Sequence, residues 1–539
     1  MSLIRNRKVK LASVLLLVLA GVLFGDTKGV ENICLIMAED MGLQIGAYGD
    51  VTVPTPALDR LAKEGVVLEN AYVTQATCSP SRGSLYSGLY PHQSGQMGLS
   101  NNFGYRLHRG VPAYPAQLRE AGYGTALNYK IHVGPEEAIG FERQIWQKEY
   151  AEWGFDDRDT RYMKRVMEAI FEEVLEPGQR FYIQPQTGET HRPFIKKDKQ
   201  VDAKVLEYAG SPYRTVEAGD VELLPYFGPD MPEDAWLKKD LAQYYNAIQR
   251  FDRAVGLVLE DLEKRDLLDK TLIIVTADHG PTYGRGKLNL YELGMHVPMI
   301  VRWPGLTEPG TRSEALVSFI DLMPTFLEVA GLPVPAYLPG RSLRDLFEGK
   351  PWRTHLYGEY TAHTSIRDYW PSRMVRDGRY KLIWNMLGGQ APGGMTPEGC
   401  PDINVSQRSP EQSVTDAVYR RFLSPPVYEL YDLEKDPYEL DNLAQKQEYA
   451  TIVDVLRQRL EDWMADTLDP FSSPEHLASF TQAYREREAQ VIAYEQEHGF
   501  DSYWGKPVTR FDYDPWLRDF GNLEEAFASA KAAGSPESF

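Results

Sequence analysis

Cysteine is scarce in this sequence, with only Cys34, Cys78 and Cys400 among 539 residues. A secreted protein of this length with so few cysteines is not held together by a disulfide framework. Cys34 lies within a short apolar run and is predicted to be a core residue, whereas Cys400 lies in a loop rich in proline and glycine. Cys78 is therefore the cysteine whose neighbours predict chemistry.

Basic residues are also in deficit. The sequence has 58 Lys and Arg residues against 77 Asp and Glu residues, so its formal net charge is −19 and its pI is near 5.1. Such a charge argues against nucleic acid or an anionic membrane surface as a partner. It does not exclude an anionic substrate, because a pocket can be locally positive.

The N-terminal apolar run is too short for a comfortable membrane span. Residues 11–24 are apolar and uncharged, and they follow a basic start at residues 5–10. This pattern is typical of a secretory signal peptide, which we predict over residues 1–25. We therefore expect an exported protein, periplasmic or secreted, with an uncleaved anchor as the alternative.

Short apolar runs alternate with helical patterns over residues 26–350, the predicted catalytic domain. Residues 33–38, 181–183 and 272–275 predict buried strands, and residues 240–265 predict an amphipathic helix. Strands that alternate with helices predict an α/β sandwich with a large, mostly parallel sheet. Ligands of such sheets bind at the carboxyl ends of the strands.

The sequence changes in character after about residue 350. Residues 373–384, with Asp377-Gly378 in the middle, predict a β-hairpin, and residues 428–431 predict another strand. We expect a smaller C-terminal subdomain over residues 351–471, built on a short antiparallel sheet. Residues 472–539 form a charged, aromatic-rich tail extension.

The segment from Cys78 to Gly88 predicts a helix whose N-terminus carries the cysteine. Pro80 suits the first helical turn, Ser79 or Ser81 can cap that turn, and Gly88 can end the helix. Free backbone N–H groups and the helix dipole favour an anion at such an N-terminus. Arg82 lies one turn inside and can point at the same anion. The alternative is an ordinary, thiolate-prone cysteine at a loop–helix junction.

This Cys-x-Pro-Ser-Arg run, with a glycine six residues after the arginine, resembles the signature of type I sulfatases. The resemblance implies that a maturation enzyme converts Cys78 to formylglycine, whose hydrate attacks a sulfate ester or sulfamate. It covers residues 31 to about 471 and has no counterpart for the tail. It also implies an alkaline-phosphatase-like sandwich.

Two acid-bearing pairs, Glu39-Asp40 and Asp278-His279, each follow an apolar strand. In sulfatases the equivalent pairs are usually Asp-Asp and Asp-Asn, and together with residue 78 they bind calcium. Hard cations prefer carboxylate and amide oxygens, whereas the nitrogen of His279 suits zinc or manganese better. We therefore predict a divalent metal site of these four residues and Cys78, with Ca²⁺ implied by the resemblance and Zn²⁺ or Mn²⁺ left open.

Four further residues match sulfatase motifs. Lys130 and His132 fit a Gly-Lys-x-His motif in which Tyr129 replaces the glycine, and on an extended strand their side chains would share one face. His191 fits the histidine of a Pro-His-x-Pro segment, and Lys287 fits the cation that touches the sulfate. The resemblance implies that Lys130 and Lys287 neutralise the sulfate oxygens and that His191, alone or with Lys287, protonates the leaving group.

It further implies that Arg82 holds the formylglycine hydrate, that Asp278 accepts its proton, and that His132 is the base that releases sulfate. In detail the chain most resembles the subgroup around heparan N-sulfatase and related bacterial polysaccharide sulfatases. That subgroup places Glu359, His363 and Arg373 near the substrate sugars.

The predicted substrate is thus a sulfated oligosaccharide or polysaccharide. The alternatives are a phosphonate or phosphate ester hydrolase of the same superfamily, and a non-catalytic binding protein for sulfated glycan. The sequence predicts neither the oligomeric state nor the sugar that loses its sulfate.

Overall fold

The computed structural model describes residues 29–100, 104–153, 160–194, 212–364, 368–389, 400–499 and 511–533. The predicted signal peptide at residues 1–25 lies outside these ranges. Within them, no helix combines the length and the apolar character that crossing a membrane requires.

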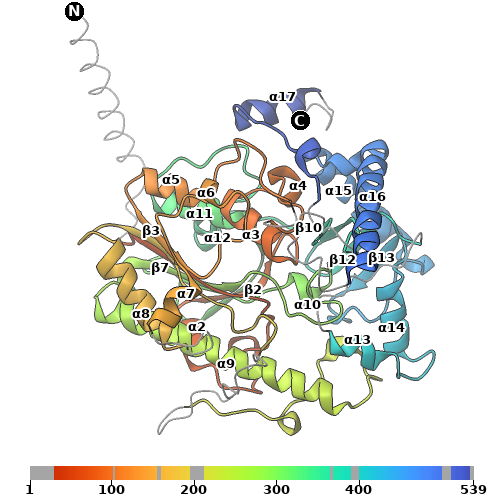
Figure 1. Ribbon diagram of the computed structural model, residues 1–539, viewed down its shortest axis with the longest axis horizontal. Coiled ribbons are helices and arrows are strands. Elements are labelled where there is room, and N and C mark those ends of the chain that lie inside the picture. Colours follow the sequence, from red (N-terminus) through yellow and green to blue (C-terminus); the bar gives the residue numbers. More distant parts are fainter. Residues whose placement is uncertain are drawn as a thin grey trace, which may run out of the picture.

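A large mixed sheet lies at the centre of the protein (Figure 1). In the described ranges it has nine strands, in the order β4-β3-β5-β1-β7-β8-β2-β9, and β6 pairs with β1. Only β8 runs antiparallel to its two neighbours in this path. The strands are β1 (Asn32–Ala38), β2 (Val66–Tyr72), β3 (Gly124–Asn128), β4 (Arg143–Ile145), β5 (Phe181–Gln184), β6 (Gln186–Thr187), β7 (Thr271–Ala277), β8 (Met299–Arg302) and β9 (Thr311–Ser318).

Helices cover both faces of this sheet (Figure 1). One face carries α3 (Cys78–Ser87), α5 (Tyr114–Glu120) and α11 (Leu322–Val329), and the other carries α2 (Pro56–Glu64), α8 (Tyr162–Ala169) and α9 (Ala235–Lys264). Every residue of β1 and β7 is buried, as expected for central strands covered on both sides. The predicted α/β sandwich with a mostly parallel sheet is confirmed.

The predicted helix over residues 240–265 begins five residues earlier than expected. The Asp234 carboxylate accepts hydrogen bonds from the backbone N–H groups of Trp236 and Leu237, so α9 starts at Ala235. The hydrophobic spacing alone does not show this cap.

The register of β1 and β7 places the two acid-bearing pairs side by side. The strands pair in parallel from Asn32 with Thr271 to Ala38 with Ala277, so both end at the same edge. Glu39-Asp40 and Asp278-His279 follow directly. The candidate site therefore lies at the carboxyl edge of the sheet.

A second, antiparallel sheet contains four strands in the described part of the chain. They are β10 (Leu356–Tyr360), β11 (Ser372–Arg376), β12 (Tyr380–Asn385) and β13 (Tyr428–Asp432). The predicted hairpin is confirmed: the Asp377 side chain accepts hydrogen bonds from the backbone of Arg379 and Tyr380 at its turn. Helix α15 (Ala450–Asp466) packs on this sheet through buried Leu456 and Leu460.

Candidate active site

The N-terminus of α3 holds Cys78, as predicted. Thr77 is the N-cap residue and makes no side-chain capping hydrogen bond, so the expectation that Ser79 or Ser81 caps the turn is wrong. The Ser81 hydroxyl instead donates to the backbone carbonyl of Asp278 at 2.5 Å and ties α3 to the end of β7. Gly88 ends the helix in the left-handed conformation, with φ 68°.

Four buried side chains form a compact ligand cluster around residue 78. One ligand atom each of Asp40, Cys78, Asp278 and His279 lies within 4.8 Å of the others. His279 Nε2 is 3.4 Å from Cys78 Sγ and 3.3 Å from the nearer Asp40 oxygen. All four side chains are almost fully shielded from solvent.

The donor set of this cluster fits a divalent cation. His279 Nδ1 lies 2.9 Å from the Gly280 carbonyl, which can only accept, so Nδ1 carries a proton and Nε2 faces the cluster. This arrangement is typical of a metal-binding imidazole. The two carboxylates supply oxygen ligands of the kind that hard cations prefer.

Glu39 lies beside this cluster and forms ion pairs with basic side chains of the site. One of its oxygens, Oε1, is 2.9 Å from Arg82 Nη2 and 2.5 Å from Lys130 Nζ. The other, Oε2, is buried and has no hydrogen-bond partner among the described residues. The predicted role of Glu39 as a metal ligand stays a prediction, and Oε2 is the atom that would serve.

Arg82 joins the two acid-bearing pairs. Its guanidinium donates to Glu39, to Asp278 at 3.1 Å and to the side-chain oxygen of Gln186 at 2.5 Å. The side chain is 0% exposed, so these partners replace all of its hydration. Arg82 is thus a fixed positive charge one helical turn from residue 78.

Lys130 and His132 reach the site, but not from an extended strand as expected. They lie in the loop after β3, where Tyr129 has φ 75° and His132 has φ 58°. Both values fall in the left-handed region, in which Tyr is rare and glycine is common. The glycine of the motif would adopt this conformation without strain, whereas Tyr129 adopts it at a cost in strain.

The charges around residue 78 act strongly on its titration. Burial alone would raise the pKa of the Cys78 thiol, but Lys130, Lys287 and His279 hold that pKa well below its usual value. Lys287 Nζ is itself 2.9 Å from Asp40, and despite burial this carboxylate raises the pKa of the lysine. The site is therefore built to hold negative charge at position 78.

Two histidines flank the same atom. The titration of His132 and that of His191 are both influenced by Cys78. Burial and Lys130 lower the pKa of His132, whereas Asp40 raises the pKa of His191 against the effect of burial. The first favours a neutral base and the second a protonated acid.

The three predicted sugar-binding residues separate into two places. His363 is half-buried near Lys287 and Cys78, whose charges act on its pKa, and its buried Nδ1 has no hydrogen-bond partner among the described residues. Glu359 and Arg373 are 0% exposed and pair with each other at 3.5 Å. The structure does not bring these two into the cluster around Cys78.

Glu359 and Arg373 instead belong to a second polar group. His92 Nδ1 lies 2.8 Å from Glu359, and Arg373 forms an ion pair with Asp469. With every charge in this group neutralised by a neighbour, a direct contact with a sugar would require the group to open.

Sequence reasoning missed three residues of the site. Gln186 accepts from Arg82 and donates to the Lys130 carbonyl, Thr282 donates to Asp40, and Thr190 donates to the Glu39 carbonyl. Each is a common polar residue outside the family motifs. Only the position of Gln186 and Thr190 after a predicted strand could have suggested them.

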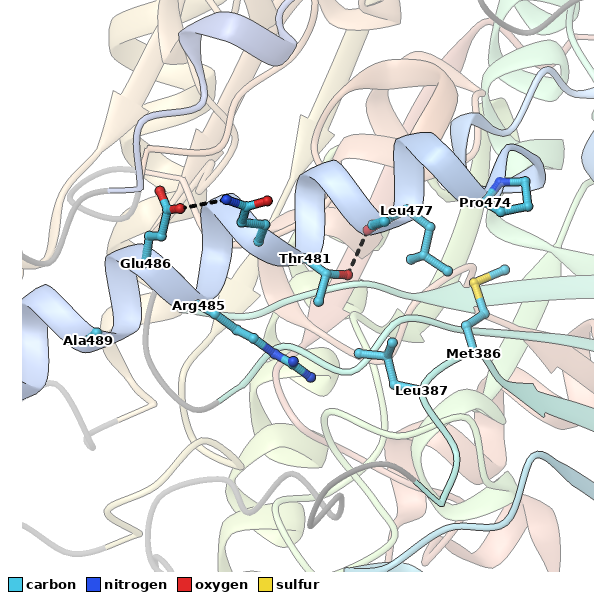
Figure 2. Close-up of a pocket in the computed structure, with 10 residues that line it drawn as sticks. Met386, Leu387, Pro474, Leu477, Thr481, Arg485, Glu486 and Ala489 are labelled. Carbon is cyan, nitrogen blue, oxygen red and sulfur yellow. Dashed lines mark hydrogen bonds between the residues drawn. The ribbon is translucent and has the colours of Figure 1, made fainter.

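A separate pocket of about 670 Å³ lies between α16 (Pro474–His498) and the end of β12. Figure 2 shows Leu477, Thr481 and Arg485 on the helix facing Met386 and Leu387. None of the candidate site residues lines it.

Comparison with known proteins places this geometry in context. A family model described as Sulfatase matches residues 31–332, and one described as N-sulphoglucosamine sulphohydrolase, C-terminal, matches residues 285–388. The chain is 29% identical over 467 residues to N-sulphoglucosamine sulphohydrolase of Homo sapiens, which covers 82% of this chain and 91% of that protein. It is 31% identical over 443 residues to an ulvan-active sulfatase of Formosa agariphila, with 80% of each chain covered.

Solved structures share the fold. One is a protein in complex with its substrate D-glucosamine-2-N,6-O-disulfate, with a TM-score of 0.60, 21% identity, and 82% of this chain and 98% of that chain covered. Another is a phosphonate monoester hydrolase from Silicibacter pomeroyi, with a TM-score of 0.60, 20% identity, and coverages of 82% and 97%. At these identities the likeness concerns the fold alone.

Proposed function

This chain belongs to the sulfatase family and is a sulfuric ester hydrolase, and from that premise we propose that it removes sulfate from sulfated saccharides. One observation carries the proposal. Arg82, Lys130 and Lys287 converge from three separate segments on carboxylates that surround the buried residue 78. Such a cluster can hold the anionic oxygens of a sulfate group against the nucleophile.

We propose that Cys78 is converted to formylglycine by a maturation enzyme. The hydrate of that aldehyde supplies the nucleophile, and its second hydroxyl allows the sulfate to leave. The helix N-terminus and its cations favour negative charge on the oxygen that would stand at position 78.

The charged residues around position 78 have separate catalytic roles in this proposal. Arg82 fixes the orientation of Glu39 and Asp278 and adds positive charge beside residue 78. Lys130 and Lys287 neutralise the sulfate oxygens in the transition state. His191, whose pKa Asp40 raises, gives a proton to the leaving oxygen or nitrogen, and His132, whose pKa is lowered, takes a proton at residue 78.

Asp40, Asp278, His279 and residue 78 would hold a divalent cation, and Glu39 Oε2 is available to it. A bound cation would supply Lewis-acid stabilisation of negative charge. We propose Ca²⁺, as in the family pattern, with Zn²⁺ and Mn²⁺ as the alternatives that the nitrogen of His279 admits.

The proposed substrate class follows from the relatives. Several are active on sulfated saccharides, and the Formosa agariphila protein is ulvan-active. The experiment is a screen of sulfated oligosaccharides with O-sulfate or N-sulfate groups, with release of free sulfate as the readout. Phosphate and phosphonate esters of one leaving group, tested in parallel, check the hydrolase alternative. Lack of sulfate release from every compound by metal-loaded, matured protein would overturn the proposal.

The place where the enzyme works is proposed from the sequence alone. The basic start and apolar run of residues 1–25 support export to the periplasm or the medium. Fractionation of a native culture with an antibody against the protein tests this.

A further inference from the structure

The C-terminal extension lies against the segments that surround the candidate site. Its described pieces are α16 and residues 511–533, which end in α17 (Leu523–Ala533). Both lie outside the residues that the two family models match. In Figure 1 α17 lies near the end of the chain. We call these two pieces together the C-terminal strap.

Helix α16 is hydrogen-bonded to the backbone next to His363. The Tyr484 hydroxyl donates to the Thr364 carbonyl at 2.7 Å, and this hydrogen bond is buried. Thr364 directly follows His363, whose own carbonyl accepts a hydrogen bond from Leu99 at 2.7 Å. The backbone of His363 is therefore fixed from one side by residue 99 and from the other by the strap.

The second piece of the strap binds residues 105–111. The Arg109 N–H donates to the Arg518 carbonyl, and the Phe520 N–H donates to the Arg109 carbonyl, both at 2.9 Å. Within the same segment, the Leu107 N–H donates to the carbonyl of Gly134, two residues after His132. Through residues 105–111, the strap thus also supports the loop that carries His132.

Aromatic rings join the two pieces to the body of the protein. Tyr369 stacks on Tyr484 with ring centroids 4.5 Å apart, and Tyr105 stacks on Phe511 at 5.5 Å. Phe511 also lies 5.7 Å from Tyr484. All four rings are at least 90% buried, so a continuous apolar contact anchors the strap, in addition to ion pairs of Arg106 with Asp514 and of Arg109 with Asp519.

We propose that the C-terminal strap positions His363, and that Tyr484 is the positioning residue through which it acts. The inference rests on the proposed function, since the position of His363 matters only if substrate binds at this site. A buried carbonyl that loses its partner is costly, so the backbone at residue 364 shifts when the hydroxyl is removed. A displacement of about 1 Å in a site can lower the rate by up to about 100-fold.

A double-mutant cycle tests whether Tyr484 acts through His363. The variants are Tyr484→Phe, His363→Ala and both together, measured as kcat/KM on a sulfated saccharide that the wild type cleaves. We expect Tyr484→Phe to lower kcat/KM by roughly tenfold, within the range for such displacements. Because both changes affect one interaction, the double variant should be no slower than His363→Ala alone.

The matched control is Tyr494→Phe, which removes the same hydroxyl from the same helix where the ring stacks on His498 at 4.2 Å. It should leave kcat/KM unchanged. The inference is overturned if the losses in the double variant multiply, if Tyr484→Phe is as fast as the wild type, or if Tyr494→Phe is equally slow.

A second readout needs no substrate and so stands apart from the proposed function. Amide hydrogen exchange over residues 357–364 should be faster in Tyr484→Phe than in the wild type and unchanged in Tyr494→Phe. Equal exchange in all three proteins would overturn the positioning role even if sulfate release is confirmed. Loss of sulfate release in the wild type, with the expected exchange, would overturn the proposed function alone.

Discussion

Arg82 and Glu39 form a fully buried ion pair, with Arg82 Nη2 2.9 Å from Glu39 Oε1. The same oxygen also lies 2.5 Å from Lys130 Nζ, so one carboxylate compensates two cations, one from helix α3 and one from the loop after β3. Removal of one partner of a buried pair leaves an uncompensated charge, which typically costs about 3–5 kcal/mol. The pair therefore matters for stability as well as for the site.

We predict that Glu39→Gln lowers the free energy of unfolding by about 3 kcal/mol, the lower end of that range, because Arg82 keeps Asp278 as a partner. Urea unfolding of the purified protein measures this. Glu263→Gln is the matched control: its carboxylate pairs with Arg60 at 3.3 Å but is 56% exposed, so its loss should cost less than about 1 kcal/mol. Equal costs for the two variants would contradict the prediction.

The sequence predicts the parts of this site that depend on strand ends and local motifs. Residues 39–40 and 278–279 follow buried apolar runs, and parallel pairing of β1 and β7 brings them together as expected. The position of Arg82 relative to Cys78 likewise follows from the geometry of one helical turn. These relationships are local or follow from a single rule of sheet geometry.

The motif predicted Lys130 and His132 as site residues, but the loop conformation by which they reach the site could not be predicted. Lys130 and His132 reach residue 78 because Tyr129 and His132 adopt left-handed conformations that no residue pattern here signals. Glu359 lies close to His363 in the sequence, and Arg373 lies opposite Glu359 on the paired strand β11. Cross-strand pairing nevertheless turns both side chains toward His92 and Asp469. Which face of a strand meets the site is decided by packing of the small sheet, which a single sequence does not reveal.

Replacement of residue 78 should separate chemistry from folding. We predict that Cys78→Ala abolishes sulfate release while the unfolding midpoint and the bound metal stay near those of the wild type, because three other ligands remain. Cys78→Ser should also be inactive, since a sulfated serine has no second hydroxyl with which to expel sulfate. Free sulfate, metal content and the mass of the peptide around residue 78 are the measurements. Release of sulfate by either variant at the wild-type rate would exclude the formylglycine mechanism.

The nitrogen ligand of His279 should bias the metal site. Imidazole suits Mn²⁺ and Zn²⁺ better than an amide oxygen does, whereas Ca²⁺ prefers oxygen. We predict that His279→Asn shifts the preference of the chelator-treated protein from Mn²⁺ toward Ca²⁺. A free ion at about 100 times its Kd stabilises the folded state by about 2.7 kcal/mol, so the unfolding midpoint with each ion gives the ranking. An unchanged ranking would show that His279 Nε2 does not bind the ion.

Acid should weaken the contact between His108 and the C-terminal strap. His108 Nδ1 accepts a hydrogen bond from the Arg518 backbone N–H at 3.2 Å, which only the neutral ring can do. Burial, with smaller effects of the Arg518 and His92 charges, lowers the pKa of His108 to about 3. In the unfolded chain this pKa is about 6.5, so the unfolded state binds more protons between these two values. The stability that the neutral ring contributes is therefore complete above pH 6.5 and is lost as the pH falls toward 3.

The variant His108→Gln isolates this effect from the titration of the carboxylates. Its side-chain oxygen can still accept from Arg518, but it binds no proton. We predict that the wild type loses up to about 1.4 kcal/mol more per pH unit than the variant between pH 6 and pH 4.5, the slope of one bound proton. Urea unfolding at several pH values in this window measures the difference. Parallel curves for the two proteins would mean that His108 takes up its proton without disturbing the strap.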